Sequence, residues 1–391
     1  MANTVVVLGA GIGGLSVAER LGEYLPDGDR VVLVDRSDRQ SLGLSLLWVM
    51  RGWRQPEEIQ TSLDRISRRG LEFVRGTVEA ILPDERRVRV SGKELAYDAL
   101  VIALGAEMAP DSVPGVAEAI GAGAPGGQFF SLDGAVALAE RFQRFEGGRL
   151  VVVVTRLPFR CPAAPYEAAL LLGDLLKERG LRDRTAIDAY TPEPFPMPVA
   201  GSTVGQALTS LLGEHGVGFH PQLELESIDV PSRELRFKSE QREPYDFLVV
   251  IPPHRPPAPV AALGLSEAGW VPVQPRTLAS PMDGVWAIGD VTSLPLPNGK
   301  ILPKAGVFAQ GEAETAARAV ARHLGREAPE PYFSGDGWCY IEVGDGKAAY
   351  GRGNFLAPPN PDIELLPPDA VHHQAKEVEE ATWRDRWRTH A

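Results

Sequence analysis

The sequence predicts an α/β protein made of two three-layer units of parallel sheet and helix, followed by a small α+β region. Three observations predict this fold. The chain opens on a strand, a helix and a second strand; a pattern of short strands recurs at an offset of 147 residues; and a strand and a helix follow residue 325 separately. A chain of 391 residues is long enough for two domains with cores of their own.

Composition excludes several classes of protein. The formal net charge is −12, and an acidic chain without a Lys/Arg run is not expected to bind nucleic acid. No apolar run reaches the roughly 18–20 residues of a spanning helix. The first residues lead directly into a strand, so we expect no signal peptide and a cytoplasmic or peripheral membrane location. Two cysteines exclude a disulfide scaffold and a four-cysteine metal site, and no metal-ligand spacing is found.

The first unit begins with Thr4–Leu8, a β-branched run typical of a buried parallel strand. The glycine-rich loop 9–14 follows, and then a helical stretch over 15–24. The next strand, 30–34, ends at Asp35. This order predicts a βαβ unit of about 30 residues with a loop of the kind that holds phosphates.

The glycines of this loop have the spacing of a dinucleotide-binding fingerprint. Gly9 permits the tight turn, Gly11 lets the backbone approach a pyrophosphate, and Gly14 lets helix and strand pack closely. The helix N-terminus faces the phosphates, and Asp35, 21 residues after Gly14, is placed to bind the ribose hydroxyls. The first unit is therefore predicted to be a Rossmann-like nucleotide-binding domain.

A second, related unit is indicated by an internal repeat. Residues 78–90 match 225–237, and the strand that follows each, 97–102 and 245–250, begins with the same Tyr-Asp pair. The second unit has its own opening strand at 150–154. We therefore expect two Rossmann-like three-layer domains.

The loop after the second opening strand has lost the glycines. Residues 155–160 read Thr-Arg-Leu-Pro-Phe-Arg, so they cannot make the same close turn under a pyrophosphate. Cys161 follows, at the start of a Pro-flanked helix. The partial positive charge of a helix N-terminus favours a thiolate there. The alternative is a buried apolar cysteine without function.

Later segments of the chain add candidate cofactor-binding residues to the first unit. Gly105 closes one strand, and another strand ends in Gly289-Asp290, where we expect Asp290 to contact a ribityl chain or a pyrophosphate. Lys304 and Gly306 precede a helix, and we expect this helix start to stabilise negative charge on a reduced isoalloxazine.

The C-terminal part carries the second cysteine, Cys339, in a strand after a glycine turn. A final helix is expected over 368–391, docked on the body of the protein. Its apolar positions are Val371, Ala375 and Val378 on one face, with Trp383 and Trp387 beyond. His372 and His373 are expected to be solvated.

Together these residues resemble the flavoproteins with two dinucleotide-binding domains, and among them the sulfide:quinone oxidoreductase and flavocytochrome c sulfide dehydrogenase family. The motif most specific to this family is the stretch Cys161-Pro-Ala-Ala-Pro-Tyr-Glu167, together with Cys339 far downstream. The resemblance implies FAD, a Cys161–Cys339 redox disulfide with Cys339 nearer the flavin, and Glu167 as the proton-moving group. It implies a sulfide or related small sulfur substrate and a quinone or cytochrome acceptor.

The departures from that family affect cofactor attachment and acceptor. Residues 36–60 hold no cysteine, so FAD is expected to be non-covalent. Residues 105–160 lack the third cysteine that the membrane-bound enzymes usually carry. The domains expected are 1–110 with 258–325 for FAD, 111–257 as a second domain with a degenerate dinucleotide site, and 326–391 carrying Cys339.

Two other functions remain open at the level of sequence. A type-2 NADH:quinone dehydrogenase shares the fold and the FAD motifs, although it needs the glycines that 155–160 lack. A non-enzymatic flavin redox sensor would use the cysteine pair for regulation. The apolar stretch 42–53 is expected either to line a flavin or quinone pocket or to pack in the core.

Overall fold

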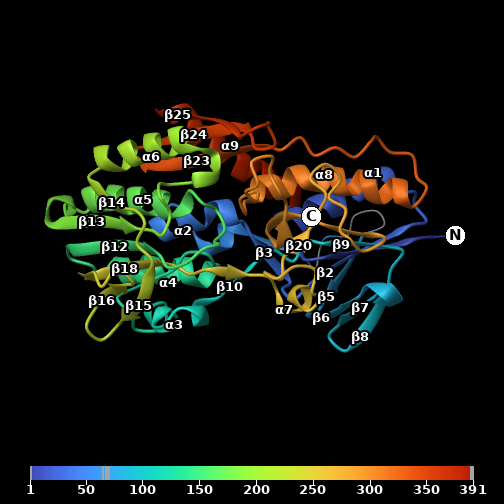
Figure 1. Cartoon of the computed structure of the whole chain (residues 1–391), viewed down its shortest axis with the longest axis horizontal. Coiled ribbons are helices and arrows are strands. Elements are labelled where there is room, and N and C mark those ends of the chain that lie inside the picture. Colours follow the sequence, from blue (N-terminus) through green and yellow to red (C-terminus); the bar gives the residue numbers. More distant parts are fainter. Residues whose placement is uncertain (1, 64–65, 67–70, 388–391) are drawn as a thin grey trace.

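Two five-stranded parallel sheets organise the chain, and the computed structural model describes residues 2–63, 66 and 71–387 (Figure 1). The first sheet has the order β21-β9-β1-β2-β5. Its strands are β1 (Thr4–Leu8), β2 (Arg30–Asp35), β5 (Leu71–Arg75), β9 (Ala99–Ile102) and β21 (Val285–Ala287). The central strands are nearly continuous apolar runs because layers cover both faces of the sheet.

These layers differ in kind. Helices α1 (Ile12–Tyr24) and α8 (Gly306–His323) pack together on one face, as Figure 1 shows. An antiparallel meander of β6 (Val78–Leu82), β7 (Arg87–Val90) and β8 (Lys93–Ala96) covers the other face, with Val88 and Val90 in the same core. The three-layer α/β prediction is confirmed for this unit.

The second sheet repeats the plan in the order β11-β18-β12-β13-β14. Its strands are β11 (Gly126–Gly127), β12 (Gly148–Val154), β13 (Thr185–Tyr190), β14 (Val217–His220) and β18 (Phe247–Ile251). Helices α5 (Ala164–Glu178) and α6 (Ser202–Glu214) accompany it, and so does a meander of β15 (Leu225–Asp229), β16 (Glu234–Phe237) and β17 (Arg242–Pro244). The sequence repeat thus corresponds to two three-stranded meanders, one in each unit.

The second unit is inserted between two neighbouring strands of the first sheet, β9 and β21. The chain leaves along β10 (Glu107–Met108) and returns along β19 (His254–Arg255), and these two strands pair antiparallel. This topology supports the proposal of a discontinuous first domain. Helix α2 (Leu46–Arg51) departs from it, because Leu47 and Met50 pack in the core of the second unit.

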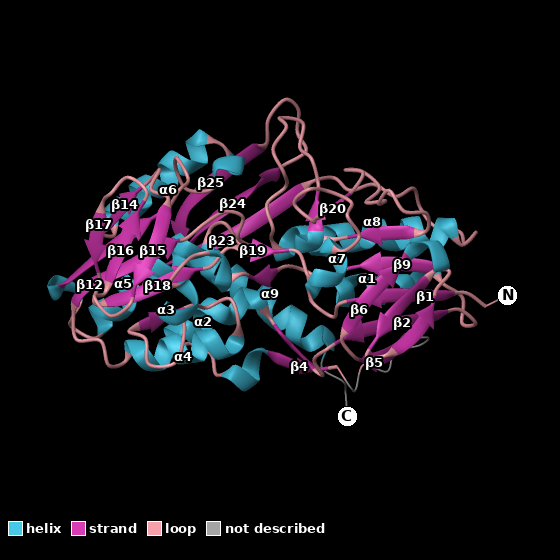
Figure 2. Cartoon of the chain, turned by 60° about the horizontal axis from the view of Figure 1, so that its bottom comes forward, coloured by secondary structure: helices cyan, strands magenta, loops and turns pink. Residues whose placement is uncertain are grey.

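A three-stranded antiparallel sheet and a long helix form the C-terminal region. The strands are β23 (Asp336–Gly344), β24 (Lys347–Asn354) and β25 (Asp362–Asp369), and helix α9 (Ala370–Trp387) follows. The sheet packs on α5 and α6, whereas α9 runs between the two large sheets in Figure 2.

The docking of α9 is confirmed, but of its expected apolar positions only Trp383 and Trp387 are buried. Val371 and Val378 are 66% and 64% exposed. The buried positions are Lys376, Glu380, Trp383 and Trp387. Two of them are charged, and they are buried because each meets an opposite charge from another element.

Shorter elements complete the chain. They are β3 (Arg39–Ser41), β4 (Gln60–Ser62), α3 (Val116–Ala119), α4 (Leu132–Phe142), α7 (Ala258–Ala261), β20 (Val271–Pro272) and β22 (Thr292–Ser293). Helix α4 begins at a Ser131 side-chain cap and packs on α2.

We predict that Arg51→Met destabilises the protein by about 3–5 kcal/mol, because it leaves the carboxylate of Asp174 buried without its cation. The Arg51 guanidinium lies 2.7 Å from Asp174, and the two side chains are only 3% and 5% exposed. Urea unfolding followed by circular dichroism measures the loss. The control is Arg30→Met, which removes the exposed pair with Glu72 and should cost less than about 1 kcal/mol. Equal losses in the two variants would contradict the prediction.

Candidate functional site

Four strands of the first sheet end at one edge, where their loops gather the predicted glycines. Gly9 follows β1 with a φ of +97°, and a Cβ atom there would lie 2.3 Å from the carbonyl oxygen of Ala103. A Cβ at Gly14 would lie 1.7 Å from the carbonyl oxygen of Gly9. Gly11, in contrast, faces open space. The loop is therefore closed on the protein side and open where a ligand would approach.

Two helix N-termini meet at this edge. Helices α1 and α8 are capped by Gly11 and Ala305, without a side-chain cap or an acidic residue in either first turn. A Cβ at Gly306 would lie 3.0 Å from Cδ1 of Ile12, so the two helix starts adjoin. Their first N–H groups have no partner within the helix and suit an anionic ligand. The residues present fit the pyrophosphate of a dinucleotide.

Asp35 lies at the end of β2, beside the same loop. One carboxylate oxygen accepts a hydrogen bond of 2.7 Å from the backbone N–H of Ala10, and the other accepts one of 2.8 Å from Ser37. The carboxylate therefore ties the glycine loop to the end of β2. Gly105, at the end of β9, has a φ of +66° and open space around it.

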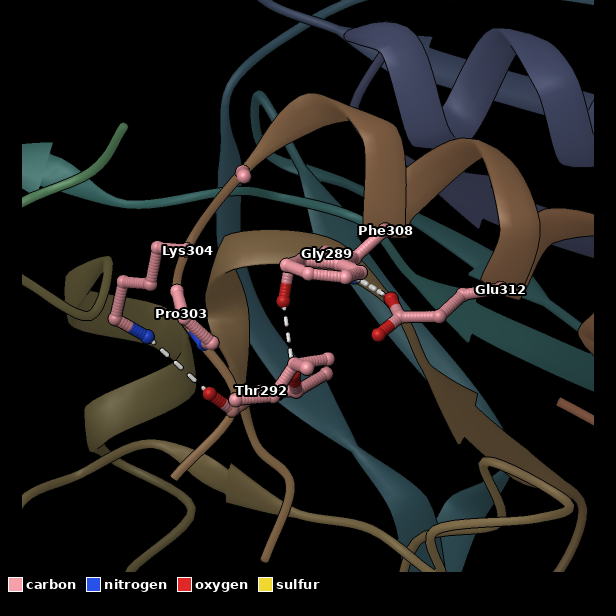
Figure 3. Close-up of a pocket in the computed structure, with 8 residues that line it drawn as sticks. Gly289, Thr292, Pro303, Lys304, Phe308 and Glu312 are labelled. Carbon is pink, nitrogen blue, oxygen red and sulfur yellow. Dashed lines mark hydrogen bonds between the residues drawn. The ribbon is translucent and has the colours of Figure 1, made fainter. Parts of the chain in front are cut away.

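Gly289 and Lys304 line a small cavity between β21 and α8 (Figure 3). The Gly289 N–H donates to the buried carboxylate of Glu312, a residue that sequence reasoning missed. The Lys304 ammonium donates to the carbonyl oxygens of Asp290 and Thr292, at 2.6 and 3.2 Å, and lies 3.4 Å from the centre of the Trp270 ring.

These contacts differ from the role expected for Lys304. Its ammonium group fixes the backbone turn at 290–292, so negative charge beside α8 would be met by the helix N–H groups. Burial lowers the pKa of Lys304 to about 8 and raises the pKa of Glu312 to about 7. Burial also raises the pKa of Asp290, although Arg160 and Lys304 act in the opposite direction.

In the second unit, the loop 155–160 stands where the first unit has its open glycine loop, and side-chain and backbone contacts fill it. Thr155 binds the carbonyl oxygen of Ile251 through both its N–H and its hydroxyl. The Arg160 guanidinium donates to the carbonyl oxygen of Phe130 and lies 5.4 Å from the centre of its ring. These contacts agree with the sequence inference that this loop does not cradle a pyrophosphate.

A larger pocket of about 760 Å³ contains both cysteines. Cys161 is exposed on its wall with a φ of +56°, and its N–H donates to the carbonyl oxygen of Lys304 at 2.7 Å. Cys339 is half-buried on β23, and both are free thiols. A Cβ at Gly351 would lie 3.2 Å from the Cys339 sulfur, so this glycine leaves room for it. Most other lining side chains are apolar, among them Met197, Val204, Phe308, Phe355 and Leu365.

The expected stabilisation of a Cys161 thiolate is wrong. Although Cys161 is exposed toward the pocket, desolvation by the neighbouring protein atoms raises its pKa to about 11, with the Glu167 carboxylate adding to the shift. The N–H of Ala164 at the start of α5 acts in the opposite direction but is outweighed. Burial raises the pKa of Cys339 to about 12, and Cys161 is the next largest cause, so the two thiols interact electrostatically.

Glu167 does not line the pocket itself, but its carboxylate interacts electrostatically with both cysteines. It is buried, and its carboxylate accepts a hydrogen bond of 2.6 Å from the Lys376 ammonium of α9. Burial raises the pKa of Glu167 to about 7 despite this partner.

Glu167, Lys376, Glu342 and His373 form one charged cluster. Sequence reasoning missed the last three of these residues. A signal for Lys376 is present in the sequence, since positions 376, 380, 383 and 387 share one helix face. The expectation that His372 and His373 are solvated is wrong, because His372 binds the carbonyl oxygen of Ala348 and His373 binds Glu342.

A second acid, Glu193, lines the pocket and was also missed. Its buried carboxylate accepts hydrogen bonds from the hydroxyls of Tyr166 and Thr191, at 2.7 and 3.2 Å. Burial raises its pKa to about 7. No feature of the local sequence indicates it, because Glu193 lies in an irregular Pro-rich loop.

Known proteins resemble this chain over most of its length. The mitochondrial sulfide:quinone oxidoreductase of Dictyostelium discoideum is 28% identical over 302 residues, which are 74% of this chain and 66% of that protein. The sulfide-quinone reductase of Aquifex aeolicus is 27% identical over 353 residues, 85% of this chain and 79% of that protein.

The fold of a solved structure agrees with these matches. The sulfide:quinone oxidoreductase structure from the hyperthermophilic bacterium Aquifex aeolicus aligns with a TM-score of 0.87 at 22% identity, over 99% of this chain and 92% of that chain. A family model described as pyridine nucleotide-disulphide oxidoreductase matches residues 3–322. This chain therefore belongs to the pyridine nucleotide-disulphide oxidoreductase family of enzymes, and the resemblance predicted from its motifs is confirmed.

Proposed function

We propose that this protein is an FAD-dependent enzyme that oxidises sulfide, or a related small sulfur nucleophile, through Cys161 and Cys339 and passes the electrons to a quinone. One observation carries the proposal: the two cysteines of the chain, 178 positions apart, line one pocket beside the start of α8. The named relatives are sulfide:quinone oxidoreductases, which supports the choice of substrate and acceptor.

FAD would be held at the carboxyl edge of the first sheet. Its pyrophosphate fits the N-termini of α1 and α8, beside the loop of Gly9, Gly11 and Gly14. Asp35, Gly105 and the turn at Gly289-Asp290 surround the same edge. When bound, the flavin supplies a two-electron acceptor for the sulfur chemistry.

The cysteines perform the sulfur chemistry in their oxidised, disulfide-bonded form. Hydrosulfide attacks the Cys161 sulfur, a new S–S bond forms there, and the Cys161–Cys339 bond breaks with its electron pair on Cys339. Re-forming that bond releases one sulfur atom, one proton and two electrons, which bound FAD would take up on behalf of the quinone acceptor.

The protein is proposed to act in the cytoplasm or at the membrane surface, where a quinone is available. Within the described residues, no helix is long and apolar enough to cross a membrane. The proposed domains are 1–110 with 258–325 for FAD, 111–257 as the second unit, and 326–391 for the Cys339 strand and α9.

We predict that Cys161→Ser and Cys339→Ser each slow flavin reduction by sulfide by orders of magnitude, because the disulfide electrophile is lost. Anaerobic stopped-flow absorbance near 450 nm measures the rate. FAD content and bleaching by dithionite should match the wild type, since neither cysteine lies in the glycine loop at the carboxyl edge of the first sheet, where FAD is proposed to bind. Sulfide reduction of Cys161→Ser at a near wild-type rate would contradict the proposal.

We predict that FAD is bound without a covalent link. The groups around its proposed site are backbone N–H groups, glycines and carboxylates, and residues 36–60 hold no cysteine. Precipitation with acid should leave the yellow colour in the supernatant. Colour retained in the washed pellet is the contrary result.

We predict that NADH does not reduce the flavin at a useful rate, because Arg160 and Thr155 occupy the loop that a second pyrophosphate would need. The measurement mixes the oxidised protein with one equivalent of NADH under anaerobic conditions, with dithionite as positive control. Bleaching by NADH within seconds would favour the dehydrogenase alternative.

A further inference from the structure

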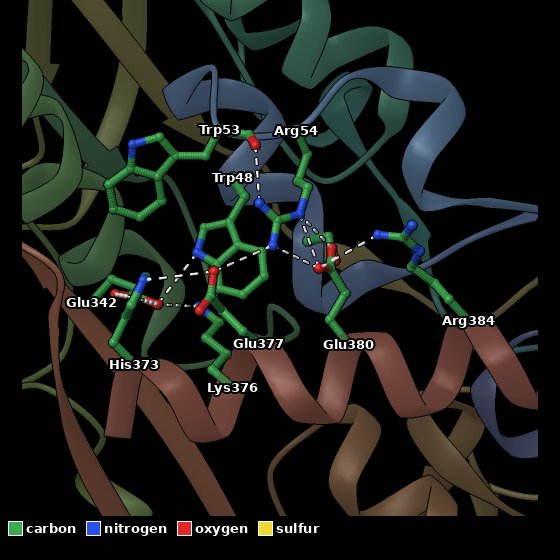
Figure 4. A network of polar contacts seen from close by, with 10 residues as sticks. Trp48, Trp53, Arg54, Glu342, His373, Lys376, Glu377, Glu380 and Arg384 are labelled. Atoms are coloured by element: carbon green, nitrogen blue, oxygen red, sulfur yellow. Dashed lines mark hydrogen bonds and ion pairs between the residues drawn. The ribbon is translucent and has the colours of Figure 1, made fainter. Parts of the chain in front are cut away.

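A line of charged side chains leads from Glu167 to the protein surface. The Lys376 ammonium lies 2.6 Å from a Glu167 oxygen and 3.8 Å from Oε1 of Glu342. The His373 ring contacts the other Glu342 oxygen through Nδ1 at 2.9 Å. Its Nε2 lies 3.9 Å from Glu377. Figure 4 shows the outer part of this line, along one side of α9.

The three inner groups of the line are buried, and exposure rises over the two outer groups. The side chains of Glu167, Lys376 and Glu342 are 4%, 2% and 0% exposed. The side chain of His373 is 19% exposed, and that of Glu377 is 45% exposed. The line therefore begins at a buried carboxylate that interacts with both cysteines and ends in solvent.

The groups around the line hold it in place. The Trp48 indole N–H donates to Glu342 at 3.3 Å, and the Trp48 ring lies 4.9 Å from the Lys376 ammonium. Arg54 pairs with Glu377 at 3.6 Å and with Glu380 at 2.9 Å. Arg384 lies 3.8 Å from Glu380, on the same helix. At the inner end, Cys161 and Cys339 are the titratable groups that interact with Glu167.

The charges suit the passage of a proton near neutral pH. Burial lowers the pKa of Lys376, but Glu167 and Glu342 outweigh that effect and raise it. Glu167 has a pKa raised to about 7 by burial, so it takes up a proton more readily than an ordinary carboxylate. Its unprotonated fraction falls as the pH drops through 7, and a retained proton would block the next turnover.

We propose that Lys376, Glu342 and His373 form a proton relay that carries the proton released at the cysteine pair from Glu167 to solvent beside Glu377. The inference rests on the proposed function. The proton comes from the S–H group of the Cys161 persulfide, and Glu167 accepts it. Lys376 then gives a proton to Glu342 and takes the one from Glu167, and His373 passes a proton outward. The electron pair leaves separately, through the flavin to the quinone.

The test compares His373→Gln with His372→Gln in the full-length protein loaded with FAD. The two histidines are neighbours on α9, but His372 contacts the Ala348 carbonyl and lies outside the line. Sulfide and a soluble quinone are mixed with each protein in weak buffer. Stopped-flow absorbance records the flavin near 450 nm, and a pH-indicator dye records the protons that reach solvent.

We expect His373→Gln to reduce its flavin in the first turnover within about two-fold of the wild-type rate, because the relay carries no proton until the first one has been released at the cysteine pair. Proton release should then lag behind flavin reduction, and steady turnover should fall about ten-fold or more. Added imidazole should restore turnover, which a purely structural role of His373 would not allow. His372→Gln should match the wild type with and without imidazole. Glu377→Gln, at the exposed end, should show a smaller loss in the same direction.

Turnover of His373→Gln equal to that of the wild type, or a loss that imidazole does not restore, would overturn the relay. An equal loss in His372→Gln would overturn it as well, because the effect would then belong to α9 as a whole. Failure of sulfide to reduce the wild-type flavin is a different result. It would overturn the proposed function, and the relay with it, before any variant is compared.

Discussion

The buried ion pair between Glu167 and Lys376 joins two segments that lie 209 positions apart in the chain. A carboxylate or an ammonium group alone at this depth would lose several kcal/mol of hydration. Each ion is therefore tolerated only because α9 brings the other one to it. The pair fixes α9 against α5, and the strand that carries Cys339 packs on α5 as well. The pair and the Cys339 strand therefore both contact α5, the helix that begins three residues after Cys161.

Helix α9 also connects the two units. Toward its C-terminal end, the Trp383 indole N–H donates to Gln40 at 3.4 Å, and Arg386 lies 3.6 Å from Glu19. Glu380 accepts from the hydroxyl of Ser45 at 2.7 Å. A helix with so many charges is buried because each charge on its inner face meets a partner, whereas Val371 and Val378 face solvent. Of the groups that anchor the helix, Lys376 is also proposed to move protons.

The two units share one parallel-sheet topology, but only the first has a loop open for a dinucleotide. In the first, the glycine loop is open toward ligand and two helix N-termini adjoin it. In the second, Thr155 and Arg160 fill the corresponding loop, and the next residue is Cys161. A site that would otherwise hold a second dinucleotide thereby presents a sulfur atom to the pocket.

The sequence by itself determined the elements that depend on neighbours along the chain. The opening βαβ unit, the repeated meanders and the roles of Gly9 and Gly14 follow from local periodicity and from sterics that act within a few residues. The cysteine pair was indicated only through resemblance to a known family. The tertiary structure decided what depends on distant partners: the burial of Lys376 and Glu342, the pocket carboxylate of Glu193, the inward turn of the Lys304 ammonium, and the placement of α2 in the second core. Burial and pKa are set by whichever groups the fold brings within a few ångströms, and the partner of Lys376 lies 209 positions away, beyond the reach of any local pattern.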